Sequence, residues 1–245
     1  MTGTTDTTGT ATRGAVPVPG AGRAGGPSVG WTELLVAIPL YLLLSGASGI
    51  VLYVVGGGDV LGSAVPVLAL GGACTLLTAC AVLALRVRWL PAAGLRRTTT
   101  GWVLAGVAAG LLTRVVAAGI GWGYQQLTGD TSNPQAFIGT SLAGGDLVTL
   151  GGVMLAGALL VPFAEELLFR GIGYGALRRY GARVAVPAAA ALFALAHGLN
   201  IVLAVAFVLG VVCALLYERS RSIWPAVVTH AVFNASGFLL AALLS

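Results

Sequence analysis

Seven apolar segments, each long enough to cross a lipid bilayer, make up most of this chain. They cover residues 33–56, 62–86, 101–124, 147–175, 184–200, 201–218 and 222–244. No water is available inside a bilayer to hydrogen-bond free backbone groups, so spans of this length and composition fold as helices. We therefore predict an all-α fold, a polytopic transmembrane helical bundle of about seven spans. The boundary between the fifth and sixth segments is a very short turn, residues 197–200.

The composition supports a membrane protein and excludes a nucleic-acid partner. Hydrophobic residues make up 57% of the chain and charged residues 9%, against about 25% charged residues in a soluble domain. All 13 basic residues are arginine, and apart from Arg114 and Arg170 they lie in the amino-terminal tail or in loops, where membrane topology explains them. The absence of lysine and the heavy use of Ala, Gly and Val are typical of a bacterium with a GC-rich genome. We expect a multi-pass protein of the cell inner or plasma membrane.

The charges in the connections alternate along the chain. Arginines lie at the amino terminus and in every second connection, whereas the other connections contain Asp59, Asp130 and Asp146 and no arginine. Cytoplasmic loops of membrane proteins carry the excess of Lys and Arg. The pattern therefore predicts a cytoplasmic amino terminus, an odd number of spans and a carboxyl terminus outside.

Three regions follow from these patterns. Residues 1–29 are rich in Thr, Gly, Ala and Pro, which predicts a disordered cytoplasmic tail. We do not expect signal-peptide cleavage, because the first apolar run begins only near Leu34 and is long enough to remain as a span. Residues 30–146 form transmembrane helices without a motif. Residues 147–245 contain nearly all of the unusual polar residues and are the expected catalytic core.

Three apolar segments carry ionisable residues at membrane depth. Glu165, Glu166 and Arg170 lie in one segment, and the only two histidines, His197 and His230, lie in two others. A charge at the centre of a membrane helix costs roughly 2.5–3.5 kcal/mol even on a lenient scale, and such residues by default mark a functional site.

The depths of these residues along their helices agree. Counted from the nearest loop arginine, Glu165 and Asn234 lie 13 residues into the membrane and His197 lies 14, about 20 Å in each case at 1.5 Å per residue. His230 lies 9 residues in, or about 14 Å. We expect three helices to bring these side chains to one site.

Helix phase separates the two glutamates. Glu166 and Arg170 are four residues apart and share a helix face, whereas Glu165 points roughly 140° away from Arg170 at 100° per residue. We predict a supporting ion pair between Glu166 and Arg170, which leaves Glu165 free to face the site. Pro162 removes one backbone hydrogen bond and is expected to kink this helix.

The residue types suit hydrolysis of an amide by an activated water. A glutamate in a low-dielectric site is a usable general base, and a water held between Glu165 and His197 would be the nucleophile. The negative charge that develops on the attacked carbonyl needs fixed donors. His230 and Asn234, four residues apart on one helix face, supply them. The pattern thus predicts peptide-bond hydrolysis with no cofactor.

Neighbouring residues are candidates for support. Phe193 lies four residues before His197, so its ring can pack beneath the imidazole and limit its rotamers. Asn200 follows His197 by three residues and either orients it or caps the end of the helix. Arg114, in the third span, has no acid within a helical turn, so we expect it to pair across helices or to meet lipid phosphate.

Two alternatives remain from the residues alone. Glu165, His197 and His230 are also a common ligand set for catalytic zinc, although no His-x-x-x-His pair occurs and Asn234 would then have no role. A non-catalytic membrane scaffold or transporter is the other alternative. Transporters usually show two matching halves, whereas the polar residues of this chain gather in the second half, which favours a single catalytic site.

The order of these motifs resembles a known family. Glu165-Glu166-x-x-x-Arg170, then Phe193-x-x-x-His197, then His230-x-x-x-Asn234 occur on successive apolar helices, over about residues 147–244. This order is similar to that of the CPBP family, the CAAX protease and bacteriocin-processing intramembrane endopeptidases, which are related to Rce1-type CAAX proteases and Abi proteins.

The resemblance implies a peptidase whose Glu165 and His197 activate water, whose His230 and Asn234 form the oxyanion hole, and whose Glu166 and Arg170 support the site. It implies a peptide or membrane-protein substrate and a lipid bilayer around the enzyme. Eukaryotic members remove the last three residues of prenylated proteins, which a bacterial member need not do. Many members are named for bacteriocin immunity or processing, so a non-catalytic immunity protein is an alternative.

Overall fold

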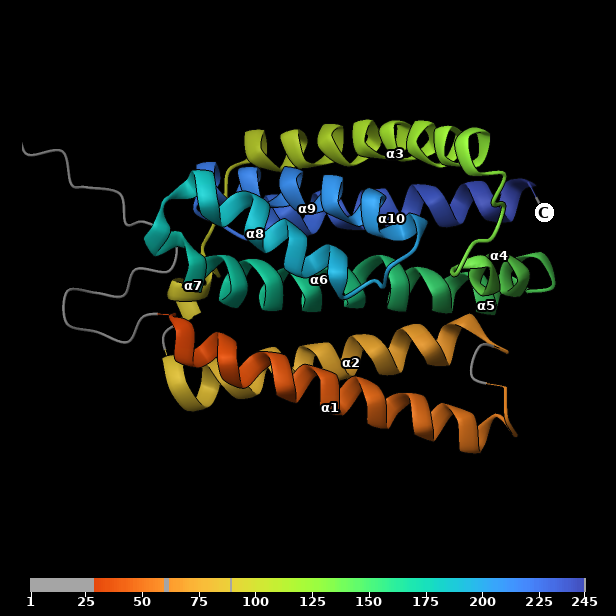
Figure 1. Cartoon of the computed structure of the whole chain (residues 1–245), viewed down its shortest axis with the longest axis horizontal. Coiled ribbons are helices and arrows are strands. Elements are labelled where there is room, and N and C mark those ends of the chain that lie inside the picture. The colour runs from red at the N-terminus through yellow and green to blue at the C-terminus, as the bar shows by residue number, and fades with distance from the viewer. Residues whose placement is uncertain (1–28, 60–61, 89, 245) are drawn as a thin grey trace, which may run out of the picture.

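The computed structural model describes residues 29–59, 62–88 and 90–244, and within them every regular element is helical (Figure 1). The predicted all-α fold is confirmed. The expected tail, residues 1–29, lies outside the described residues except for its last position. The elements are α1 Trp31–Val55, α2 Ala64–Val82, η1 Leu83–Val87, η2 Leu90–Ala93, α3 Thr100–Thr128, α4 Ala136–Ala143, α5 Leu147–Val153, η3 Met154–Leu160, α6 Val161–Glu166, η4 Leu167–Tyr174, α7 Gly175–Leu177, η5 Arg178–Tyr180, α8 Ala182–Leu195, α9 Ile201–Ser220 and α10 Trp224–Leu244.

Six helices in the described residues are long and apolar enough to cross a membrane. They run over Trp31–Val55, Ala64–Val87, Thr100–Thr128, Leu147–Tyr180, Ile201–Ser220 and Trp224–Leu244. The predicted count of about seven holds only if α8 is included, and the predicted segment 184–200 is too long. Helix α8 has 14 residues, or about 21 Å, which is short of the hydrocarbon core of about 30 Å.

The short α8 has a local cause. The backbone turns at Gly198, whose φ of 90° is favourable only for glycine. Asn200 then caps α9, because its side chain accepts a hydrogen bond from the backbone N–H of Val202. Helices α8 and α9 therefore form a hairpin, and His197 lies at its turn.

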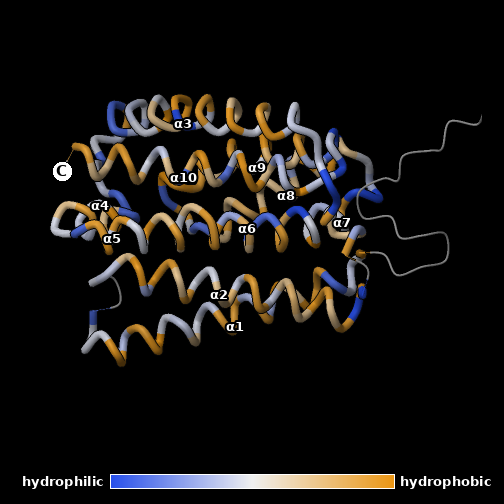
Figure 2. Tube along the Cα trace, turned by 180° about the vertical axis from the view of Figure 1, so that it is seen from behind, coloured by the Kyte–Doolittle hydropathy of each residue, from blue (hydrophilic) through white to orange (hydrophobic). Residues whose placement is uncertain are grey.

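The two ends of the bundle differ in charge. The loops that carry Arg86 to Arg97, Arg178 to Arg183 and Arg219 to Arg221 gather at the end where α1 begins, whereas Asp59, Asp130 and Asp146 lie at the opposite end, where α10 finishes (Figure 1). Figure 2 shows many of the hydrophilic residues at the two ends and mostly apolar residues along the helices between them. The structure thus places the two groups of loops on opposite sides, as the charge pattern predicts; which side faces the cytoplasm is assigned by the arginines.

Ion pairs fasten the helices at the arginine-rich end. The carboxylate of Glu218 in α9 accepts hydrogen bonds from the Tyr174 hydroxyl at 2.7 Å and from two nitrogens of Arg178 at 2.8 and 2.9 Å. Glu33 at the start of α1 pairs with Arg86 of η1 at 3.1 Å. These contacts tie η4 and η5 to α9, and α1 to η1.

Helix α10 packs closely against α3 through glycines. A Cβ at Gly106 would lie 2.7 Å from the Pro225 carbonyl oxygen, and one at Gly110 would lie 2.6 Å from that of Thr229. The Thr229 hydroxyl donates across the same contact to the Gly106 carbonyl at 3.1 Å. Small residues four apart allow such close approach between membrane helices. Arg114, four residues after Gly110, continues this face of α3.

Candidate active site

The predicted pair between Glu166 and Arg170 forms at the centre of the bundle. Arg170 Nη1 lies 2.8 Å from Glu166 Oε1, and both side chains are fully buried. Arg170 Nη2 donates to the Gly210 carbonyl of α9 at 3.1 Å, and the guanidinium lies 4.6 Å above the Phe193 ring. The pair therefore joins three helices and is more than a local contact within one helix.

Glu166 also holds His230, which the sequence did not indicate. Its Oε1 lies 3.1 Å from His230 Nδ1, and an ionised carboxylate only accepts, so Nδ1 carries a proton and donates. His230 Nε2 then faces Glu165, at 3.8 Å from Oε2. Spacing along one helix cannot reveal a contact made across helices, and for this reason the link was missed.

Glu165 is the acid that remains without a fixed partner. Its Oε2 is buried and has no hydrogen-bond partner within the described residues, and 13% of its side chain is exposed. A buried polar atom without a partner is uncommon in native structures, and a catalytic role is one of its explanations. The phase argument that turned Glu165 away from Arg170 agrees with this placement.

His197 is oriented by the backbone of its own helix. Its Nδ1 lies 2.8 Å from the Phe193 carbonyl oxygen, and since a carbonyl only accepts, Nδ1 donates. A neutral ring in this tautomer offers the Nε2 lone pair as an acceptor. The Phe193 ring packs against the imidazole with a centroid separation of 4.6 Å, as predicted from their spacing.

Phe193 is the packing centre of the site. The side chain is fully buried, and besides His197 its ring contacts His230 edge-on at 5.6 Å and Phe169 at 5.2 Å. One aromatic ring thereby fixes the relative position of both histidines. The sequence predicted only the first of these contacts.

Asn200 acts on the turn after His197. Its Oδ1 caps α9 at 2.8 Å from the Val202 nitrogen, and its Nδ2 donates to the backbone carbonyl of His197 at 3.2 Å. Of the two roles considered for Asn200, capping is therefore the one the structure displays, and no contact with the imidazole is formed.

Asn234 bonds to a carbonyl that the neighbouring helix leaves free. Its Nδ2 donates to the Gly157 carbonyl oxygen at 2.8 Å. Gly157 lies in the π-helical segment η3, where the N–H of Val161 donates to Ala156, five residues back. The next residue, Pro162, has no N–H to give to Gly157. The proline thus creates an acceptor that positions Asn234, and the second Nδ2 hydrogen remains available.

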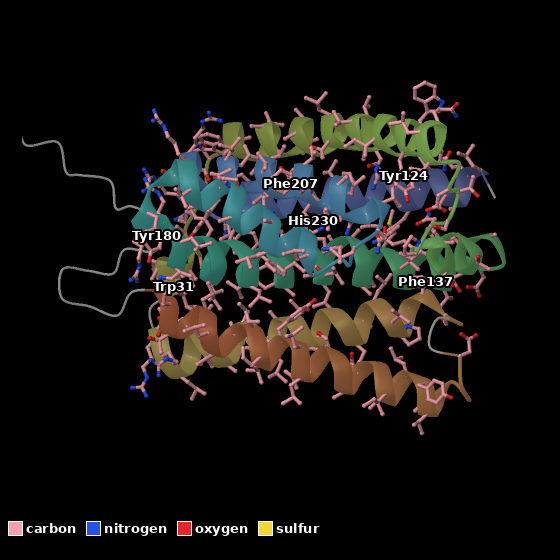
Figure 3. All side chains as sticks on the ribbon, in the orientation of Figure 1. Trp31, Tyr124, Phe137, Tyr180, Phe207 and His230 are labelled. Atoms are coloured by element: carbon pink, nitrogen blue, oxygen red, sulfur yellow. The ribbon has the colours of Figure 1, made fainter. Side chains whose placement is uncertain are left out.

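All four predicted catalytic residues line one cavity of about 690 Å³: Glu165, His197, His230 and Asn234. Glu166 and Arg170 are not in its wall, which agrees with a supporting role. The cavity wall continues through Tyr124, Asp130 and Ser132 at the arginine-free end of the bundle. Figure 3 shows His230 at mid-length and Tyr124 toward that end.

The first half of the chain also builds this cavity. Tyr41 of α1, Thr75 of α2 and Arg114 of α3 line it, although no motif marks them in the sequence. Arg114 hydrogen-bonds through Nε to the Phe233 carbonyl oxygen at 3.2 Å. The expected pairing across helices is therefore made with a backbone carbonyl of α10.

The candidate zinc ligands do not form a recognisable metal site. Within the described residues, no group of three His, Cys, Asp or Glu side chains is placed to hold a metal ion. His230 is also committed through Nδ1 to Glu166. The metal content of the purified enzyme distinguishes this alternative from water activation by Glu165 and His197.

Comparison with known families agrees with the ordered motifs. Residues 147–236 match the family described as type II CAAX prenyl endopeptidase Rce1-like. These residues form an Rce1-like domain. A search of curated proteins and a search of solved structures found no match. The Rce1-like domain contains every candidate residue from Glu165 to Asn234, and the predicted CAAX protease resemblance is thereby confirmed over this part of the chain.

The Rce1-like domain does not enclose the cavity alone. It supplies the helix from residue 147 to 180, the α8–α9 hairpin and most of α10. Helices α1 to α3, which precede the match, supply the rest of the wall. The match over residues 147–236 indicates a membrane peptidase as the class of function.

Proposed function

We propose that this protein is an intramembrane endopeptidase in which Glu165 and His197 activate a water molecule and His230 and Asn234 stabilise the oxyanion. One observation carries the proposal. Four side chains of complementary chemistry, from three helices, line a single cavity at membrane depth, and the carboxylate among them has an oxygen without a hydrogen-bond partner.

Each residue has one task in the reaction. A water hydrogen-bonds to Glu165 and to the Nε2 lone pair of His197. As the water oxygen attacks the peptide carbonyl carbon, Glu165 takes its proton. The C–N bond then breaks, and the protonated Glu165 gives the proton to the leaving amine. The products are a carboxylic acid and an amine.

The oxyanion is stabilised by donors from α10. Asn234 offers its second Nδ2 hydrogen, and the bond to Gly157 fixes its direction. His230 presents Nε2, which donates when the ring carries both protons, and Glu166 holds the other side of the ring. Donors fixed before the reaction need no reorganisation as charge develops, which is the source of their catalytic effect.

The cavity suggests how substrate arrives. Its wall reaches exposed residues of the α3–α4 connection, Ser132, Asn133 and Gln135, at the arginine-free end. By the positive-inside rule this end faces away from the cytoplasm. We propose that peptides or membrane proteins are cleaved from that side, with the bilayer around the bundle.

The proposal is tested by cleavage of a peptide library with the purified protein in detergent. We expect the wild type to cleave a subset of peptides and Glu165→Gln to cleave none, with both unfolding at similar temperatures, because the buried Oε2 of Glu165 makes no hydrogen bond that the substitution would remove. Full activity in Glu165→Gln, or no cleavage by a well-folded wild type across library and vesicle-embedded substrates, would contradict the proposal.

A further inference from the structure

An arginine that takes no part in the proposed reaction faces the cavity. Arg114 lies in the middle of α3, 14 residues from each end of the helix, or about 21 Å. It lines the cavity together with His230 and Asn234. Within the described residues it makes no ion pair with a carboxylate.

The guanidinium is held in a built site. Its Nε and Nη2 both donate to the Phe233 carbonyl oxygen, and its Cζ lies 3.8 Å above the Phe233 ring. The chain leaves space for it at Gly237, where an added Cβ would lie 2.7 Å from Cζ. The two hydrogen bonds and the contact with the Phe233 ring therefore hold the guanidinium in place, while Nη1 has no hydrogen-bond partner among the described residues.

A cation at this depth needs an anion to balance it, because an unpaired charge in a low-dielectric region is unfavourable. Lipid phosphate lies at the membrane surface, about 21 Å of helix away, so the anion must come into the cavity. Peptides bring one kind of anion, the carboxylate. Arginine binds carboxylates through parallel N–H donors with defined geometry.

We propose that Arg114 is the residue that binds a carboxylate of the substrate and so sets where the peptide lies in the cavity. This inference rests on the proposed peptidase function. It makes Arg114 a specificity residue contributed by the half of the chain outside the Rce1-like domain.

The residues of α10 that Arg114 contacts indicate how far the bound carboxylate lies from the cleaved bond. Arg114 lies beside Phe233 and Gly237 of α10. The proposed oxyanion donors on the same helix are His230 and Asn234. Phe233 and Gly237 lie about one and about five residues from the middle of these donors, so the contact is at most about 8 Å away along the helix. An extended peptide covers this distance in about two residues. The carboxylate is therefore either a peptide carboxyl terminus or an acidic side chain close to the bond that is cleaved.

Binding is measured first, without cleavage. In a Glu165→Gln background, labelled apolar peptides are titrated in three forms: a free carboxyl terminus, a carboxyl-terminal amide, and an amide with one internal Glu. We expect the free acid or the Glu-containing amide to bind about 10- to 100-fold more tightly than the plain amide, the range for a hydrogen bond to a charged group. Which of the two does so identifies the source of the carboxylate.

The variant Arg114→Gln should remove this preference and leave the affinity for the plain amide nearly unchanged. Arg114→Lys keeps the positive charge but lacks the parallel N–H donors of the guanidinium. It should retain only part of the preference for peptides with a carboxylate. Thermal unfolding controls for folding, and Gly237→Ala, which moves the guanidinium without changing the charge, should also weaken the preference.

The inference is overturned if Glu165→Gln proteins with and without Arg114→Gln show the same ratio of affinities for acid and amide peptides. It is also overturned if neither protein binds any of the peptides. A merely structural role would weaken all peptides equally. Cleavage of the same peptides in the wild-type background is a separate readout. Loss of cleavage with an intact acid preference would instead remove the proposed function and leave the carboxylate site in place.

Discussion

At the scale of single residues, the sequence assigned most of the roles but not the connections between them. Helix phase paired Glu166 with Arg170, and spacing placed Phe193 beneath His197; both contacts occur in the structure. The bond from His230 to Glu166 was not predictable, because it depends on how two helices 64 residues apart in the chain are rotated against each other. In the proposed mechanism Glu166 therefore has two tasks, to pair with Arg170 and to position His230.

A double substitution separates these two tasks of Glu166. Glu166→Leu alone leaves Arg170 buried and unpaired, which should lower the free energy of unfolding by about 3–5 kcal/mol. Adding Arg170→Met replaces the whole pair with apolar groups and should recover most of that stability. Cleavage should stay low in both variants, because His230 Nδ1 has lost its acceptor. Denaturant titration and turnover are the measurements, and wild-type turnover in the double variant would show that Glu166 is purely structural.

At the scale of elements, apolar length predicted the helices well and their internal geometry poorly. The segment 147–175 is one long helix as expected, but two π-helical stretches, η3 and η4, flank the six residues of α6 that carry the glutamates. No periodicity in the sequence marks a π turn. The one residue in the sequence that indicates an irregular helix here is Pro162, which predicts a kink. In the structure its missing N–H leaves the Gly157 carbonyl free to accept a hydrogen bond from Asn234.

Restoring that N–H tests the positioning of Asn234. In Pro162→Ala the new N–H competes for the Gly157 carbonyl, so Asn234 loses its fixed direction. We expect unchanged or higher thermal stability and a kcat reduced by up to about 100-fold, the effect of small misplacement of a catalytic group.

Asn234→Ala is the matched comparison for this variant. Removing an oxyanion donor should lower kcat by roughly 10²–10³-fold with little change in KM, so Pro162→Ala should lie between it and the wild type. Unchanged kcat in Pro162→Ala, or a rise in KM alone in Asn234→Ala, would contradict the assigned role of the amide.

At the scale of the whole molecule, the charge pattern predicted which loops share an end of the bundle, and the structure agrees (Figure 1). The sequence did not predict that the motif-free first half builds part of the cavity wall. Tyr41, Thr75 and Arg114 lie on three helices whose apolar patterns carry no sign of a shared cavity. The association of α3 with α10 depends on glycine contacts, which become recognisable only once the partner helix is known.

The side from which substrate arrives can be measured in intact cells. Ser132 is exposed and lines the cavity, so Ser132→Cys, in a background without the three native cysteines, should react with a membrane-impermeant thiol reagent added outside. A bulky reagent there should also block cleavage by obstructing the cavity. A matched Arg179→Cys at the other end should react only after the membrane is opened. The reverse labelling pattern would contradict the orientation assigned from the arginines.

The most direct test of the water-activation mechanism is the turnover of the purified enzyme after a strong chelator and dialysis, measured together with its metal content. The account predicts that cleavage of the library peptides continues at the untreated rate with no stoichiometric metal, because Glu165 and His197 supply the activation. One zinc per chain, lost together with activity and restored by zinc alone, would contradict it and make Glu165, His197 and His230 ligands.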